Sequence, residues 1–236
     1  MALPLAVILA GGLGTRLGPL AEGLPKPMIP VAGRPFLEHV VLQLAAQGFE
    51  EILFLVGYRA EVVEAHFGDG HAYGLSIRYS REPEPQGTGG AFQFARPRIQ
   101  RPFLMLYGDL FRPIDYAALC ANLDGNALAV YPYVEGLTTI ACPNIGLSLD
   151  ESHVECYEKD RPDLPLTHVD AGFGCFQPEV LDLLPKGKSN FEARIYPALA
   201  REGRLRALPV TRDFFDIGNP SDLVHARQWL QVSLKE

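Results

Sequence analysis

The first candidate for chemistry is a glycine-rich loop that directly follows an apolar run near the N-terminus. Residues 5–10 read LAVILA and residues 11–18 read GGLGTRLG. Glycines after a buried strand let the backbone come close to a ligand and point N–H groups at phosphate oxygens. Arg16 adds a planar guanidinium fork suited to phosphate oxygens. The segment predicts a phosphate-binding loop, although the glycines alone would also fit a structural turn with a surface arginine.

Two common phosphate-binding motifs do not fit this loop. A dinucleotide-binding G-x-G-x-x-G read from Gly12 would need glycine where Leu17 stands. A Walker loop would need the G-K-[ST] sequence, which does not follow. A nicotinamide-dependent dehydrogenase, which the order of strand, glycines and helix would otherwise suggest, is therefore disfavoured.

Lys26 follows Arg16 ten residues later and stands between two prolines that fix an extended path. The loop L-A-G-G-x-G-T-R-L followed by P-K-P-M resembles the opening of the sugar-1-phosphate nucleotidyltransferase family, the NDP-sugar pyrophosphorylases. The resemblance implies transfer of a nucleotidyl group from a nucleoside triphosphate to a sugar 1-phosphate, with release of pyrophosphate. It implies catalytic roles for Arg16 and Lys26. The nucleotide-binding residues implied in this segment are Leu9, Ala10, Gly11, Gly12, Gly14 and Thr15.

Further segments of the same resemblance follow in order along almost the whole chain. Residues 86–91, QGTGGA, resemble the loop beside the base, which implies nucleotide contacts by Gly87 and Thr88. Asp109 after Gly108, and Asp216 in FDIGNP, resemble the two aspartates that hold the metal, and Asp109 is also a catalytic candidate. The sugar-phosphate residues implied by the E-K, V-D-A-G and F-E segments are Glu158, Lys159, Asp170, Gly172 and Glu192. Each of these residues alone would also fit a turn or a solvated strand end; their shared order favours function.

Repulsion between two anions is the main obstacle to this reaction, because a sugar-phosphate oxygen must approach the α-phosphorus of a triphosphate. Mg²⁺, the cofactor that the resemblance implies, can neutralise charge when Asp109 and Asp216 hold it. Arg16 can hold the departing β- and γ-phosphates, and Lys26 and Lys159 can draw the sugar phosphate toward the α-phosphate. The nucleophile is already ionised at neutral pH, so no general base is needed.

Glu82, five residues before Gly87, is the residue most informative about the base. A carboxylate can accept hydrogen bonds from guanine N1–H and N2–H₂, whereas uracil offers one donor and two acceptors. An exposed loop acid is an equally good interpretation of Glu82. The segment 82–91 resembles the D-glycero-D-manno-heptose 1-phosphate guanylyltransferase branch, where G-T-G-G-A is typical; mannose 1-phosphate relatives more often carry G-T-A-G. The resemblance implies GTP and this heptose phosphate, with mannose 1-phosphate or another base as alternatives.

Two departures from the family pattern affect the sugar side. Residues 143–145, PNI, stand where the family often has a Y-G segment, so one sugar contact stays open. Asp170 replaces the common asparagine or serine and could read a hydroxyl only as an acceptor.

Composition limits the partners. The 236 residues carry a net charge of −7 with a sequence pI near 5.4, which argues against nucleic acid or an anionic membrane surface. The four cysteines form no C-x-x-C pair and are expected to be reduced, small buried residues. No signal peptide or membrane-spanning run is evident, so a cytoplasmic protein is expected. The sequence leaves the oligomeric state open, and a homodimer stays among the alternatives.

The elements expected to position these residues alternate strongly in the first half. Apolar runs predict strands at 5–10, 51–56, 75–79 and 103–107, and helices are predicted at 35–47, 59–67 and from the 86–90 loop to about 95. The pattern predicts a doubly wound, mixed but mainly parallel α/β sheet, which the resemblance makes a Rossmann-like nucleotidyltransferase fold.

Short strand-like runs in the second half predict a small antiparallel extension that faces the substrate. They lie at 127–133, 138–141, 146–149, 154–158 and 167–176, with helices predicted at 178–184, 191–201 and 220–232. One domain over 1–236 is expected, with a nucleotide-binding half to about 125 and a sugar-phosphate-binding half from about 126. A regulatory module that keeps the fold without catalysis is a further alternative; such a protein would be expected to have lost Arg16, Lys26 or a metal aspartate.

Overall fold

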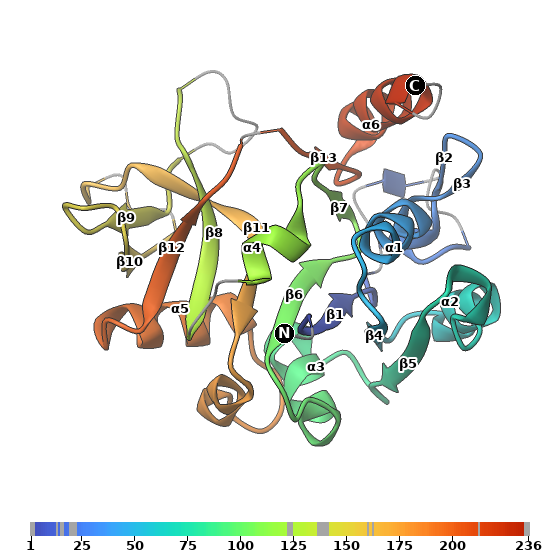
Figure 1. The fold of residues 1–236 in the computed structure, drawn as a ribbon, viewed down its shortest axis with the longest axis horizontal. Helices are drawn as coiled ribbons and strands as arrows, with labels where there is room; N and C mark the ends of the chain where they lie inside the picture. The colour runs from blue at the N-terminus through green and yellow to red at the C-terminus, as the bar shows by residue number, and fades with distance from the viewer. Residues whose placement is uncertain are drawn as a thin grey trace. The chain divides into compact units, whose positions relative to one another are not determined.

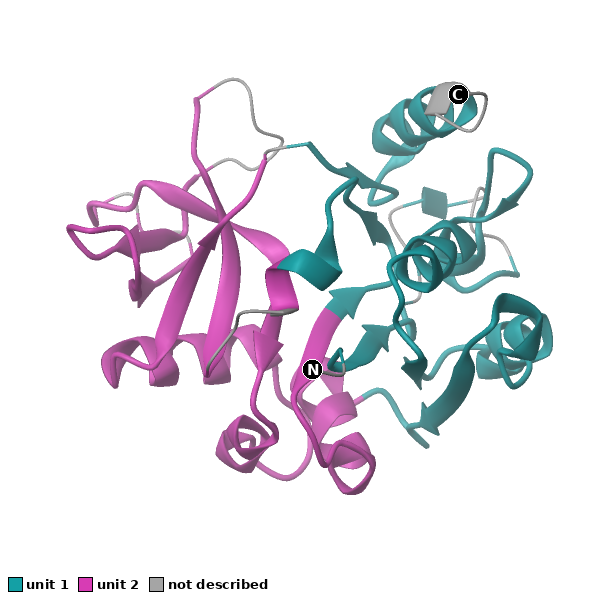
Figure 2. Ribbon diagram, in the orientation of Figure 1, with its two compact units in different colours: residues 1–85, 106–118, 213–236 teal, residues 86–105, 119–212 magenta. Residues whose placement is uncertain are grey.

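The computed structural model describes residues 3–12, 14, 17–18, 23–121, 125–135, 142–159, 161, 163–211 and 213–233. The site candidates Thr15 and Arg16 and the strand expected at 138–141 lie outside these residues. The chain divides into two compact units (Figure 2). Unit 1 comprises residues 1–85, 106–118 and 213–236, and unit 2 comprises residues 86–105 and 119–212. Neither unit is a continuous half of the sequence.

Unit 1 is built on three parallel strands, β1 (Leu5–Leu9), β4 (Glu51–Val56) and β5 (Ser76–Arg81), with β4 pairing both others (Figure 1). Its helices are α1 (Phe36–Ala46), α2 (Ala60–Phe67) and α6 (Pro220–Ser233). Short elements complete it: the 3₁₀ helices η2 (Lys26–Met28) and η3 (His71–Tyr73), and the strands β2 (Pro30–Val31), β3 (Arg34–Pro35), β7 (Leu110–Phe111) and β13 (Phe215–Asp216).

Strands β1 and β4 are buried on both faces, as their continuous apolar sequence predicts, whereas β5 alternates between buried and exposed residues. In β4, every residue from Ile52 to Val56 is at most 2% exposed. The Phe54 ring lies 5.2 Å from Phe67 of α2 and 5.8 Å from Tyr79 of β5, measured between ring centroids. This core fixes the strand ends from which the site loops leave.

Unit 2 combines antiparallel and parallel pairing. Strand β11 (His168–Phe176) pairs antiparallel with β8 (Asn126–Pro132) and β9 (Ile145–Leu147), and β9 pairs antiparallel with β10 (Val154–Tyr157). Strand β12 (Leu205–Pro209) runs parallel to β8. The helices are α3 (Gly87–Ala95), α5 (Phe191–Arg201), η4 (Arg96–Arg98) and η5 (Pro178–Leu183). Strand β6 (Phe103–Tyr107) and helix α4 (Tyr116–Ala121) each contribute residues to both units.

An aromatic cluster forms the core of unit 2. The Phe92 ring of α3 lies 4.6 Å from Phe191 at the start of α5, and Phe191 lies 5.4 Å from Phe176 of β11. Tyr196 of α5 stacks on Phe176 at 5.9 Å and meets Tyr157 of β10 edge-on at 5.0 Å. These contacts attach both helices to the strands that carry the sugar-side candidates.

The predicted fold class, a mainly parallel doubly wound sheet with an antiparallel extension, is confirmed. Strands 51–56 and 103–107 and helix 191–201 have the predicted bounds, and most other elements differ by one or two residues. The main correction concerns 86–90, which was expected to be a loop: α3 already begins at Gly87, so the glycines form its first turn. The segment 178–183 is a 3₁₀ helix, and β12 was not predicted.

Two further expectations can be compared with the structure. Cys175 is buried, but Cys120, Cys142 and Cys156 are partly exposed, which corrects the prediction of four buried cysteines; none forms a disulfide. In the described part of the chain, no helix combines the length and the apolar character needed to cross a bilayer.

Candidate functional site

The ends of β1 and β6 bring the first loop next to Asp109 within unit 1. The Gly108 N–H donates to the Leu9 carbonyl at 2.9 Å, and the Lys26 N–H donates to the Gly12 carbonyl at 3.1 Å. A Cβ on Gly108 would stand 3.0 Å from that Leu9 oxygen, a tight contact that glycine avoids. The backbone therefore joins the loop, the P-K-P-M segment and the Gly108-Asp109 turn.

Lys26 forms an ion pair with the Asp109 carboxylate. The Lys26 side chain is 10% exposed and that of Asp109 is 29% exposed, so the pair is partly shielded from water. Lys26 opens η2 between Pro25 and Pro27, which fix its backbone. Two of the predicted catalytic residues are therefore in direct contact. In this structure their side chains bind each other.

Asp216 is brought beside Asp109 by strand pairing. In the antiparallel pair of β13 and β7, Asp216 lies opposite Leu110, and the Ile217 N–H donates to the Asp109 carbonyl at 3.3 Å. The Asp216 Oδ1 accepts the Gly218 N–H at 2.9 Å, which orients the carboxylate. The two predicted metal aspartates thus stand on adjacent backbone segments although they are far apart in sequence.

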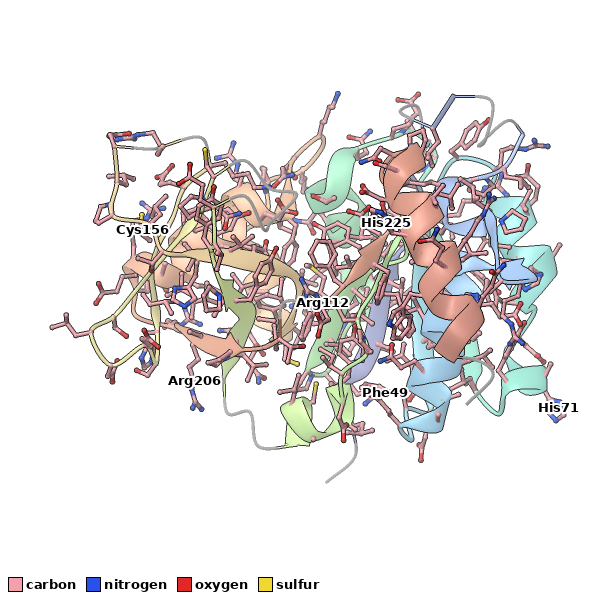
Figure 3. All side chains as sticks on the ribbon, turned by 90° about the horizontal axis from the view of Figure 1, so that it is seen from above. Phe49, His71, Arg112, Cys156, Arg206 and His225 are labelled. Atoms are coloured by element: carbon pink, nitrogen blue, oxygen red, sulfur yellow. The ribbon has the colours of Figure 1, made fainter. Side chains whose placement is uncertain are left out.

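Buried polar contacts hold the segment that follows Asp109. Arg112, labelled in Figure 3, is 1% exposed, and its guanidinium lies 4.8 Å from the centroid of the Phe214 ring. The Gln43 amide of α1 donates to the Arg112 carbonyl at 2.6 Å, and the Gln47 amide donates to the Ile114 carbonyl at 2.7 Å. These residues could not be found from the sequence, because a buried polar side chain has no signature apart from its tertiary contacts.

The donor set fits a magnesium ion shared with phosphate. Mg²⁺ is usually held by one or two carboxylates plus substrate oxygens, and Asp109 and Asp216 supply two carboxylates. No group of three or more His, Cys, Asp or Glu side chains suited to a metal occurs among the described residues. Asp222, in the first turn of α6, lies beside Asp216: burial, followed by a hydrogen bond to Asp216, raises its pKa to about 6, so its charged form is disfavoured there. A bound cation would offset this repulsion between neighbouring carboxylates.

Glu82 lines a recess of about 510 Å³ in unit 1, whose other lining residues are Gly57, Tyr58, Arg81, Pro83, Glu84 and Pro85. Glu82 directly follows β5, and its N–H donates to the carbonyl of Val56, the last residue of β4, at 3.2 Å. A Cβ on Gly57 would lie 3.1 Å from the Glu82 Oε1, so glycine leaves room for the carboxylate. The structure thus places Glu82 on the wall of this recess, at the start of the segment that follows β5.

The sugar-side candidates meet in unit 2 around Tyr157. The Tyr157 hydroxyl donates to Glu192 Oε2 at 3.3 Å and to Asp170 Oδ2 at 3.5 Å. Lys159 forms an ion pair with the same Glu192 carboxylate. Burial, followed by the charges of Asp170 and Glu192, raises the pKa of Tyr157 well above its usual value, so the phenol stays a donor. Tyr157 was missed by sequence reasoning, since a tyrosine before an E-K pair reads as a core residue.

Two predicted residues of the sugar side act through the backbone. Gly172 has a φ of 77° and donates its N–H to Asp170 Oδ1 at 2.8 Å, next to a register shift in β11. Asn144, in the segment that departs from the family pattern, accepts the Asp170 N–H at 3.0 Å. Glu158 is exposed and donates its N–H to the Asn144 carbonyl at 3.0 Å. Asp170 is therefore held on both its backbone and its carboxylate.

Gly87 and Thr88 contact the chain before α5. The Thr88 hydroxyl accepts the Phe191 N–H at 2.9 Å, and the Gly89 N–H donates to the Ser189 carbonyl at 3.0 Å. A Cβ on Gly87 would lie 2.5 Å from that carbonyl oxygen. These glycines are thus required at least by packing against residue 189. The structure therefore gathers the candidates into one group in unit 1 and one in unit 2.

Comparison with known proteins decides the family. A family model described as nucleotidyl transferase matches residues 5–140, more than half of the chain. The chain belongs to the nucleotidyl transferase family. The matched residues include the first loop, Lys26, Glu82, the start of α3 and Asp109.

Individual nucleotidyl transferase relatives agree with the predicted resemblance. Mannose-1-phosphate guanylyltransferase of Mycobacterium tuberculosis is 33% identical over 223 residues, which cover 93% of this chain and 62% of that protein. D-glycero-alpha-D-manno-heptose 1-phosphate guanylyltransferase of Campylobacter jejuni is 41% identical over 125 residues, which cover 53% of this chain and 56% of that protein. This chain thus spans less than two thirds of the length of either relative.

A solved protein structure shares the fold of this chain. HddC from Yersinia pseudotuberculosis, crystallised in complex with GMP-PN, superposes with a TM-score of 0.79 at 27% sequence identity. The superposition covers 97% of this chain and 100% of HddC. The fold predicted from the sequence is therefore that of a nucleotidyl transferase.

Proposed function

We propose that this chain is a Mg²⁺-dependent guanylyltransferase that joins GTP to a manno-configured sugar 1-phosphate and releases pyrophosphate. The observation that carries the proposal is the convergence in unit 1 of the glycine loop, Lys26, Asp109 and Asp216. The backbone bonds from Gly108 to Leu9, from Lys26 to Gly12 and from Ile217 to Asp109 build this arrangement from segments far apart in the sequence.

Charge neutralisation is the chemistry that this arrangement can supply. Asp109 and Asp216 would hold Mg²⁺, which would supply neutralisation of phosphate charge. Lys26, whose ammonium group pairs with Asp109, would contribute its positive charge to phosphate oxygens at the same site. Arg16 is proposed to hold the departing phosphates. The sugar phosphate is the nucleophile and needs no base, so positioning and electrostatics supply the rate.

Guanine is the base that the recess beside Glu82 favours. A carboxylate at its wall can accept both guanine N1–H and N2–H₂, while uracil and adenine lack that pair of donors. The relatives support this choice, since both named enzymes are guanylyltransferases and HddC was crystallised with GMP-PN. Gly57 lets the carboxylate lie close to the backbone, because a Cβ there would stand 3.1 Å from the Glu82 Oε1.

The sugar side in unit 2 supports a polyhydroxylated substrate with a phosphate. Glu192 and Asp170 are acceptors held by the Tyr157 hydroxyl, and Lys159 provides a cation whose present partner is Glu192. A phosphate that binds Lys159 would release Glu192 to accept sugar hydroxyls. Relatives named for mannose 1-phosphate and for the manno-heptose 1-phosphate both match, so the proposed substrate is manno-configured. The heptose 1-phosphate is the preferred candidate, because the G-T-G-G-A segment resembles that branch of the family.

Pyrophosphate release tests the proposal directly. Purified protein with Mg²⁺ is offered GTP, UTP, CTP, dTTP or ATP together with mannose, D-glycero-D-manno-heptose or glucose 1-phosphate. Release confined to GTP and one manno-configured sugar is the expected result. Release with another pair would retain the nucleotidyl transfer and refute the specificity. No release with any pair would contradict the proposal and favour a module that binds without catalysis.

A further inference from the structure

The start of α3 is tied to the start of α5 by a short hydrogen-bonded ladder inside unit 2. The Ser189 N–H donates to the Gln86 carbonyl at 2.9 Å, and the Gly89 N–H donates to the Ser189 carbonyl at 3.0 Å. A third bond runs from the Phe191 N–H to the Thr88 hydroxyl oxygen at 2.9 Å. Three consecutive bonds of this kind make the two segments one structural piece.

Glycine is needed in this ladder because the two segments touch. A Cβ on Gly87 would meet the Ser189 carbonyl oxygen at 2.5 Å, and a Cβ on Gly89 would overlap the Ser189 hydroxyl. Below the ladder, Phe92 of α3 packs on Phe191 of α5 with 4.6 Å between ring centroids. The side of the loop that a nucleotide-binding interpretation would leave open is thus filled by residues 187–191.

Thr88 acts as a cap for α5. The first amides of a helix have no partner within the helix, and side-chain oxygens usually satisfy them. In α5, the Asn190 side chain accepts the Ala193 N–H at 2.7 Å, while the Phe191 N–H is satisfied by Thr88 from outside the helix. One lone pair of the Thr88 hydroxyl is therefore committed to α5.

The residue that follows Phe191 is Glu192, whose carboxylate binds Tyr157 and Lys159. Shifting the first residue of α5 shifts this carboxylate with it. We infer that Thr88 is a positioning residue for the sugar-phosphate side, fixing Glu192 through the Phe191 amide, rather than a nucleotide ligand. The inference rests on the proposed sugar-phosphate role of Glu192.

Three substitutions test the role of Thr88. Thr88→Val keeps the branched shape and removes the acceptor, Thr88→Ala removes the acceptor with less bulk, and Thr88→Ser keeps the hydroxyl. For Thr88→Val and Thr88→Ala, the KM for the sugar 1-phosphate is expected to rise about fivefold to tenfold, the scale of one lost hydrogen bond. The KM for GTP should stay within about twofold, and Thr88→Ser should restore the wild-type sugar KM.

Amide hydrogen exchange at residues 189–193 gives a readout that does not need activity. Faster exchange of the Phe191 amide is expected in Thr88→Val and Thr88→Ala but not in Thr88→Ser. Equal exchange in all three variants would overturn the inference whatever the activity. A KM rise confined to GTP would make Thr88 a nucleotide ligand instead. Failure of the proposed function itself would show separately, as absent pyrophosphate release in the wild-type protein.

Discussion

Replacing Tyr157 by phenylalanine probes how the sugar side is held together. Tyr157 is 4% exposed, and its hydroxyl is the donor shared by Glu192 and Asp170. The substitution keeps the ring that packs edge-on against Tyr196 and removes only the oxygen. The two carboxylates then lose their common donor and are free to separate.

The size of the effect follows from the bond lengths. Hydrogen bonds to charged groups contribute about 1.5–3 kcal/mol at good geometry. At 3.3 and 3.5 Å both bonds are long, so together they are expected at the lower end of that range. A loss of about 1.4 kcal/mol corresponds to about a tenfold change. In Tyr157→Phe we therefore expect the KM for the sugar 1-phosphate to rise about tenfold.

Steady-state pyrophosphate release, with one substrate varied at a time, measures the effect. The KM for GTP should change by less than about twofold, because the lost bonds lie on the sugar side only. Tyr196→Phe is the matched control: it removes another buried hydroxyl of the same cluster, which lies 4.0 Å from the Met105 sulfur. Equal sugar KM values in Tyr157→Phe and wild type would refute the reasoning. An equal rise in Tyr196→Phe would show general damage to the core.

Three further substitutions address the metal, the ammonium group and the base. Asp216→Asn keeps an oxygen for the Gly218 N–H, so the melting temperature should hold while turnover falls about hundredfold or more; wild-type turnover at all Mg²⁺ concentrations would remove the metal assignment. Lys26→Met should lower turnover to a similar extent, while the free energy of unfolding measured in urea should change by no more than about 1 kcal/mol, since Asp109 is partly solvated. A large loss of stability with normal turnover would show that the ion pair has a structural role. Glu82→Gln should reduce the preference for GTP over ATP about tenfold or more, measured as the ratio of kcat/KM values; an unchanged nucleotide profile would refute the role of Glu82.

The local sequence was sufficient to predict features that depend only on neighbouring residues. The apolar run 51–56 predicts a buried parallel strand, and β4 has those bounds. Prolines on either side of Lys26, and the Asn219-Pro220 start of α6, likewise depend on neighbouring residues only. The motif order also identified the family, because it needs residue types and spacing but no geometry.

The glycines at the start of α3 show what the local sequence cannot predict. Their sequence suggested room for a nucleotide. In the structure, the space beside Gly87 and Gly89 is occupied by Ser189, about a hundred residues further along the chain. A glycine in a sequence indicates that another group comes close to the backbone, but not whether that group belongs to a ligand or to the chain itself. Tyr157 and Arg112 were missed for a related reason: a buried polar side chain is recognised by its partners, and those partners come from other elements.

The sequence by itself determined the fold class, the family and the identities of the residues that can carry charge. Only the tertiary structure decided how those residues are grouped. The pairing of β7 with β13 joins Asp216 to Asp109 and Lys26 in unit 1, while the aromatic core of unit 2 places Tyr157 between Asp170 and Glu192. Periodicity reports which face of an element is buried, but long-range packing selects its partner, and electrostatic chemistry at a site depends on that choice.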